Sequence, residues 1–244
     1  MTPGDVLKYA LHLISVPKCV CCKERLDFPN YVFCPKCSAE YKENRARNCG
    51  ICAKPLYDCD CTNHYLEAHF IKRLFKVFRY KQRDENRAAN SLIYSLKRDN
   101  REDVLAFAAD ELCAAMSASV TSDEVIFTNV PRRRAAIVKY GIDHSADLAR
   151  RIAKRLGKKY LPLLASKSKV EQKALRGADR LRNADFYVKR KLDLTGKTVI
   201  IVDDIVTTGA SMASAAMLIR GLGAKKIWGA ALATAYRDTD ISKG

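Results

Sequence analysis

The chain has 244 residues, enough for one core of ordinary size and a small additional module. Hydrophobic residues make up 48% and charged residues 29%, the balance of a soluble globular protein, and no stretch is long and apolar enough to span a bilayer. The formal net charge of +17 favours anionic partners such as phosphates, nucleic acid or an acidic membrane surface, although a solvated basic surface is the alternative.

Residues 1–18 are expected to form a short helix that ends near Pro17. Their pattern is mildly amphipathic, and Lys8 is the basic residue between Met1 and Ser15. A signal-peptide core and a small-residue cleavage site are both missing, so we expect a cytoplasmic protein.

Nine of the ten cysteines lie between residues 19 and 61, a segment with few apolar runs. Without an export signal, such clustering favours metal over disulfides. A two-residue spacer lets two thiolates meet one tetrahedral Zn²⁺, and two such pairs complete a structural site. The expected sets are Cys19, Cys22, Cys34 and Cys37, and then Cys49, Cys52, Cys59 and Cys61.

The second set is less regular, because one residue separates Cys59 from Cys61. Cys21, His64 and His69 remain alternative ligands. Reduced surface thiols and a redox-active pair are the other interpretations, but the pairs lack a thioredoxin-like βαβ context.

The middle of the chain is predicted to alternate helices with short strands. Apolar spacing predicts helices at 84–97, 102–119 and 144–156. Strands are expected at 124–130, where Pro131 stops the run, and at 160–164. Residues 64–80 mix apolar and basic side chains, and residues 165–195 are polar and basic, so neither segment is assigned an element.

The last part predicts a parallel sheet. Residues 197–202 form a continuous apolar run of the kind buried in parallel sheets. A helix at 210–222 and a second apolar strand at 227–233 follow. Strand–helix–strand alternation at this spacing indicates an α/β fold with right-handed crossovers.

The most informative stretch is 199–211, where the apolar strand leads through Asp203-Asp204 into a Thr- and Gly-containing loop and a helix. In open parallel sheets, ligands bind beyond the carboxyl ends of the strands, and a helix N-terminus favours a phosphate. Gly209 lets the backbone approach closely. The two carboxylates would repel a phosphate, so a ribose diol or a divalent cation is their natural partner. The stretch therefore suits a 5-phosphorylated ribose; a strand-to-helix turn capped by an Asp is the alternative.

This string resembles the loop that binds 5-phosphoribosyl 1-pyrophosphate (PRPP) in type I phosphoribosyltransferases. The resemblance implies ribose contacts from the two aspartates, phosphate contacts from residues 207–211, and Mg²⁺ with the PRPP. The expected binding residues are Asp203, Asp204, Ile205, Val206, Thr207, Thr208, Gly209, Ala210 and Ser211. Catalysis in such enzymes is mostly positioning and electrostatics, so no nucleophilic side chain is assigned.

Residues in order before the loop narrow the resemblance to the ComF (ComFC) family of competence proteins. They are Leu96-Lys97, Val130-Pro131, Gly141 with Asp143, Gln172, Arg180, Asn183 and Phe186. The resemblance implies a double zinc ribbon in residues 1–65 and a phosphoribosyltransferase-like α/β domain with a parallel sheet in residues 66–244.

One position departs from the family pattern. The Arg that usually precedes the Gly of the 139–145 loop is Tyr140 here, which leaves nearby basic residues to replace it. The candidates for the pyrophosphate side are Pro131, Arg132 and Arg133.

Two functions remain open. The first is a PRPP-binding protein of DNA uptake and natural transformation, with DNA-uptake proteins as partners. Its basic stretch, residues 131–182, would contact the phosphates of single-stranded DNA, or else serve as a solvated face that attracts PRPP. The second is an active phosphoribosyltransferase with a small-molecule or nucleobase acceptor in nucleotide metabolism. A glutamine amidotransferase fragment would need an N-terminal catalytic cysteine, which Met1-Thr2 does not supply.

Overall fold

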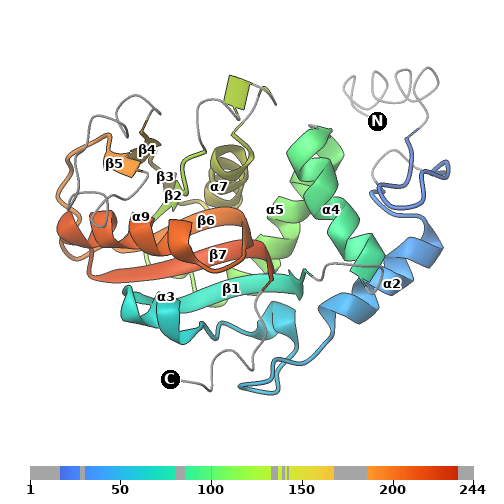
Figure 1. The fold of residues 1–244 in the computed structure, drawn as a ribbon, viewed down its shortest axis with the longest axis horizontal. Helices are drawn as coiled ribbons and strands as arrows, with labels where there is room; N and C mark the ends of the chain where they lie inside the picture. Colours follow the sequence, from blue (N-terminus) through green and yellow to red (C-terminus); the bar gives the residue numbers. More distant parts are fainter. Residues whose placement is uncertain are drawn as a thin grey trace, which may run out of the picture.

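The centre of the fold is a five-stranded parallel sheet in the order β1-β7-β6-β2-β3. We describe it from a computed structural model that covers residues 17–27, 31–80, 86–99, 101–132, 137–138, 141, 143–167 and 186–235; the helix expected at 1–18 lies almost wholly outside this part. The strands are β1 (Ile71–Arg79), β2 (Val125–Asn129), β3 (Lys159–Tyr160), β6 (Thr198–Val206) and β7 (Lys226–Thr234). A separate antiparallel pair, β4 (Leu164–Ser166) and β5 (Phe186–Val188), lies near the β3 edge (Figure 1).

Helices cover both faces of the sheet, as the continuous apolar run of β6 requires. One face is packed by α4 (Arg87–Arg98), α5 (Glu102–Met116) and α7 (His144–Arg155). The other is packed by α9 (Ala210–Gly221) and the short α3 (His64–Ala68), with α9 in front of the sheet in Figure 1. Within the described ranges, none of the helices combines the length and the apolar character that crossing a bilayer requires.

The cysteine-rich segment packs directly against this framework. Its helix α2 (Pro35–Arg45) contacts α4 and β1. Its 3₁₀ turn η1 (Leu56–Asp58) contacts β1 and α5. Tyr41 donates its hydroxyl to Glu111 of α5 at 2.8 Å, and Glu40 accepts the backbone N–H of Ala88 at 2.8 Å. Buried residues of the segment therefore continue the hydrophobic core of the α4–α5 face.

The sequence predictions hold for the long elements and fail for one short strand. The helices expected at 84–97, 102–119, 144–156 and 210–222 are confirmed as α4, α5, α7 and α9. The strand expected at 160–164 is wrong: β3 ends at Tyr160, and β4 begins at Leu164 in the other sheet. Pro162, which has no N–H to donate to a ladder, lies between them. The unassigned segment 64–80 forms α3 and β1.

Candidate functional site

The two adjacent aspartates lie within β6 rather than after it. Asp203 is in register with Ala231 of β7, and Val206 is still paired with Thr234. The expectation that the strand ends before the aspartates is therefore wrong, because Ile205 and Val206 continue the ladder. Asp204 is consequently buried, with 9% of its surface exposed, while both carboxylates remain near the carboxyl end of the strand.

Two helices hold the carboxylates in place. Asp203 Oδ1 accepts hydrogen bonds from Ser145 Oγ in α7 at 3.0 Å and from the backbone N–H of Asp204 at 2.9 Å. Asp204 Oδ2 lies 3.7 Å from Lys97 Nζ in the last turn of α4. Burial raises the pKa of Asp203 to about 7, and the charge of Asp204 adds to the effect, against the hydrogen bonds and Lys97. Asp203 thus changes its protonation near neutral pH.

After Val206 the chain turns at once into α9. Gly209, whose φ is +87°, precedes the first helical residue, Ala210. Thr208 Oγ1 accepts the N–H of Ala210 at 3.3 Å, and neither Asp203 nor Asp204 caps the helix, so an aspartate cap does not explain the motif. The Thr207, Thr208 and Ser211 side chains are exposed around the first turn. A small pocket of about 50 Å³ is lined by Asp203 and residues 205–212. Free N–H groups and the positive end of the helix dipole make such a turn an anion site.

Gly209→Ala is expected to damage both the fold and this turn. A left-handed φ costs an alanine about 1–2 kcal/mol. The added Cβ would also lie 2.8 Å from Leu66 Cδ2 of α3, so the loop must shift. Chemical denaturation and phosphate-ligand titration measure the two effects. Gly196→Ala is the matched control, because Gly196 has φ +79° and open space around it. Equal losses of stability and unchanged ligand affinity in both variants would contradict the close fit.

A larger pocket of about 640 Å³ adjoins the first turn of α7, within the range for small-molecule sites, about 300–1,000 Å³. Of the residues expected on the pyrophosphate side, Pro131 and Arg132 line this pocket, and Arg133 lies outside the described residues. Asp143 caps α7 through the N–H of Ala146 at 3.1 Å and accepts the N–H of Arg132 at 3.4 Å. The remaining lining residues are Asn129, Ile137, Arg150, Tyr160, Pro162, Leu164, Ala165, Ser166, Tyr187 and Lys189.

His144 is buried beside these groups, with 3% of its surface exposed. Burial lowers its pKa and the positive charge of Arg132 lowers it further, against the charges of the neighbouring aspartates. Sequence reasoning gave no role to His144 or Ser145. Their position at the start of a helix, just after Asp143, was the available signal. Lys97 entered only as part of a resemblance.

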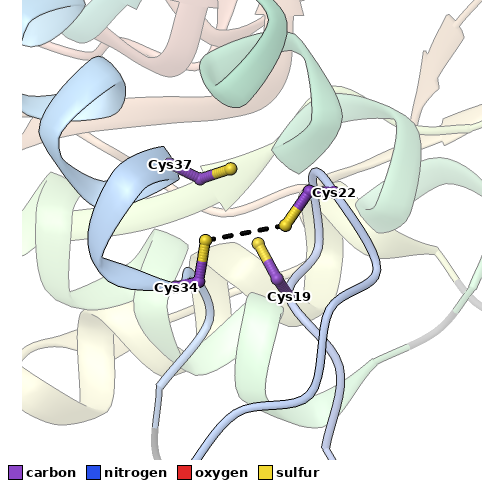
Figure 2. A group of neighbouring side chains, drawn as sticks. All are labelled: Cys19, Cys22, Cys34 and Cys37. Atoms are coloured by element: carbon purple, nitrogen blue, oxygen red, sulfur yellow. Dashed lines mark hydrogen bonds between the residues drawn. The ribbon is translucent and has the colours of Figure 1, made fainter.

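The cysteines form two groups, as their spacing predicts, and in each the four sulfurs lie within 4.8 Å of one another. Figure 2 shows the first group, Cys19, Cys22, Cys34 and Cys37, with 3.5 Å between the sulfurs of Cys22 and Cys34. A tetrahedron with Zn–S bonds of about 2.3 Å separates its sulfurs by about 3.8 Å. The second group contains Cys49, Cys52, Cys59 and Cys61.

Thiol chemistry also favours a bound cation. Burial raises the pKa of Cys22 to about 11 and raises that of Cys37 more, so adjacent thiolates do not form together without one. Four soft thiolate donors suit Zn²⁺. Each group can hold one structural metal ion. The alternative ligands Cys21, His64 and His69 belong to neither group.

Residues 137–241 match the family model described as the phosphoribosyl transferase domain. The match includes β6, the loop and α9. The chain therefore combines a parallel α/β fold with a segment, residues 137–241, that is similar to the phosphoribosyl transferase domain, and a cysteine-rich module precedes this segment.

Two ribose-phosphate pyrophosphokinases are similar to parts of the chain. A ribose-phosphate pyrophosphokinase of Thermococcus kodakarensis is 60% identical over 37 residues, 15% of this chain and 13% of that protein. Ribose-phosphate pyrophosphokinase 2 of Archaeoglobus fulgidus is 30% identical over 131 residues, 43% of this chain and 44% of that protein. The chain thus spans less than half the length of either relative.

Among solved structures, a purine phosphoribosyltransferase from Pyrococcus horikoshii is 23% identical, with a TM-score of 0.34 and coverage of 52% of this chain and 70% of that one. An adenine phosphoribosyltransferase from Thermoanaerobacter pseudethanolicus is 17% identical, with a TM-score of 0.36 and coverage of 54% and 80%. These TM-scores are low, and the similarity to phosphoribosyltransferases rests on the match of residues 137–241.

Proposed function

We propose that this chain is a PRPP-binding, phosphoribosyltransferase-like protein of the ComF family that acts in DNA uptake during natural transformation. The observation that carries the binding site is the junction of β6 and α9, where two carboxylates held by Ser145 and Lys97 adjoin the helix N-terminus that follows Gly209. Asp203 and Asp204 accept the ribose hydroxyls. The N–H groups and hydroxyls of residues 207–211 hold the 5′-phosphate.

Metal ions take two parts in this proposal. Mg²⁺ accompanies PRPP and offsets the charge of its pyrophosphate, beside Pro131, Arg132 and Arg133. Zn²⁺ occupies the cysteine groups, and thiolate ligands persist in a reducing compartment, which supports a cytoplasmic location.

Thermal unfolding tests the ligand class. A ligand that binds only the folded state at 100 times its Kd stabilises it by about 2.7 kcal/mol. PRPP with Mg²⁺ and ribose 5-phosphate should both raise the melting temperature, whereas inorganic phosphate at the same concentration should have little effect. Equal shifts from all three would show a general anion effect and would count against a ribose site.

The second candidate function is phosphoribosyl transfer to a small-molecule or nucleobase acceptor. The 640 Å³ pocket beside α7 supports it, because apolar Ile137 and Leu164 share its lining with polar Asn129 and Tyr187. Incubation with PRPP, Mg²⁺ and a nucleobase mixture, followed by pyrophosphate detection and mass spectrometry, separates the two functions. A phosphoribosylated acceptor would establish the enzyme, and pyrophosphate release no faster than without protein favours a binding role.

Within the described part of the basic stretch, several cationic side chains in or just after α7 already form ion pairs with carboxylates. Arg151 pairs with Glu102, Arg155 with Asp110, and Lys158 with Asp123. A second basic surface is a groove of about 490 Å³ near the first residues of β1 and β7, lined by Phe70, Lys72, Arg73, Arg220, Lys225, Lys226, Ile227 and Trp228. Lys72 and Arg73 of this groove pair with Glu67 and Asp60, so Arg220, Lys225 and Lys226 are its further cations for a nucleic-acid backbone.

Single-stranded DNA is expected to bind weakly and to lose affinity steeply with salt, because phosphate contacts release counterions. Two double variants separate the surfaces: Arg133→Glu with Arg134→Glu, and Lys225→Glu with Lys226→Glu. Fluorescence anisotropy across a salt series should show a shallower slope for whichever pair contacts DNA. An affinity that stays flat with salt would rule out backbone contacts at both surfaces.

A further inference from the structure

Lys76 has a buried ammonium group beside the second cysteine group. It lies in β1 with 2% of its surface exposed. Its Nζ donates to the carbonyl of Cys61 at 2.7 Å, to Cys59 Sγ at 3.2 Å, and to the carbonyls of Cys59 and Leu74 at 3.4 Å. In the part of the chain that the structure covers, it forms no ion pair with a carboxylate.

A buried ammonium is costly unless an opposite charge compensates it. Four thiolates around one Zn²⁺ carry a formal charge of −2, and Lys76 is a cation in hydrogen-bonding contact with one of their sulfurs. The backbone N–H groups of Ile51 and Cys61 also donate to sulfurs of this group, each at 3.4 Å. The neighbourhood is therefore built for a negatively charged centre.

The segment that carries the second cysteine group also reaches the phosphate loop, residues 207–211, through α3. Two residues after Cys61, Asn63 Oδ1 accepts the N–H of Leu66 at 2.8 Å and starts α3. Leu66 is fully buried and lies under the loop, so close that a Cβ at Gly209 would approach its Cδ2 to 2.8 Å. Lys76 donates to the Cys61 carbonyl and so holds the chain in place just before α3 begins.

We propose that Lys76 balances the charge of the metal centre formed by Cys49, Cys52, Cys59 and Cys61, and that this centre positions the phosphate loop through α3 and Leu66. Lys76 and Leu66 are positioning residues, since neither touches the ligand. The second half of the proposal rests on the proposed function, and the first half does not.

Lys76→Met tests the first half, because it removes the charge and keeps most of the volume. Mutation of a residue that hydrogen-bonds a metal ligand typically lowers metal affinity by about 10–100-fold. We expect one of two zinc ions to pass to a coloured chelator at a 10–100-fold lower chelator concentration, while the other is released as in wild type. Lys76→Arg should restore much of the difference, because it keeps the charge.

If Lys76 does not balance the charge of the metal centre, Lys76→Met leaves zinc release unchanged. Replacing a costly buried cation by an apolar side chain is then neutral or stabilising for the fold, and both zinc ions are released as in wild type. That outcome overturns the proposal. If Lys76→Met does not fold, Lys76→Gln, which keeps N–H donors without the charge, makes the same test. Cys113→Ser, a thiol outside both groups, is the control.

Cys52→Ser and Leu66→Ala test the link to the loop. Both should weaken PRPP binding about tenfold, and Leu66→Ala should keep both zinc ions. Wild-type affinity in Cys52→Ser would overturn the link. If wild-type protein itself binds no PRPP, the proposed function fails, and the zinc-release result still decides the role of Lys76.

Discussion

Asp203→Asn is expected to stabilise the protein at pH 8 and to weaken PRPP binding at the same time. The folded-state pKa of about 7 lies above the ordinary value of about 3.9, so the folded state retains a proton that the unfolded state loses. Stability therefore falls as pH rises from about 4 to 7, and the full penalty applies above pH 7. The two pKa values set an upper limit of about 4 kcal/mol, and with relaxation of the site we expect a gain of about 1–3 kcal/mol.

Urea denaturation at pH 4, pH 6 and pH 8 measures this effect. The variant should match wild type near pH 4 and exceed it progressively at higher pH. Asp123→Asn is the control, since Asp123 is exposed and forms its ion pair with Lys158, far from the β6–α9 junction in the chain. A variant that is less stable than wild type at pH 8, with an unchanged pH profile, would contradict the assignment of a buried, destabilising carboxylate.

Removal of the metal is expected to have the largest effect on the fold. Structural zinc supplies about 10–16 kcal/mol of apparent binding free energy in small zinc modules, and this energy is folding energy. Because Phe33 and Tyr41 of the cysteine-rich segment lie in the core that includes α4 and α5, chelation should destabilise more than the segment itself.

Metal analysis and thermal unfolding check this prediction. Protein purified without chelator should carry about two zinc ions per chain, and EDTA should lower the melting temperature and expose residues 17–61 to proteases. Much less than one zinc ion per chain, or equal melting temperatures with and without EDTA, would contradict a structural role for the metal.

Local sequence was sufficient for the parts of the site that come from one segment. The apolar run at 197–202, the adjacent aspartates and the Gly-containing turn all lie together in the chain, so their chemistry could be inferred directly. The cysteine groups were equally accessible, because ligand spacing limits which thiolates reach one metal ion. Even the one-residue spacer between Cys59 and Cys61 proves compatible with a compact group.

Long-range contacts could not be inferred in this way. Ser145 and Lys97 reach Asp203 and Asp204 from helices far earlier in the chain, and only the order of the strands brings them together. β1 was missed for a related reason. Arg73 and Lys76 interrupt its apolar pattern, and their partners are Asp60 and the cysteine group, which lie beside the strand only in the folded protein.

Calorimetric titration with PRPP and Mg²⁺ tests most directly whether the β6–α9 junction binds a phosphoribosyl group. Wild type should bind one equivalent per chain. Hydrogen bonds to charged groups contribute about 1.5–3 kcal/mol each, so Asp203→Asn and Asp204→Asn should each weaken binding about tenfold to a hundredfold. Thr208→Val should cost less, because backbone N–H groups still hold the phosphate. An unchanged affinity in both Asn variants would contradict the assignment of this site.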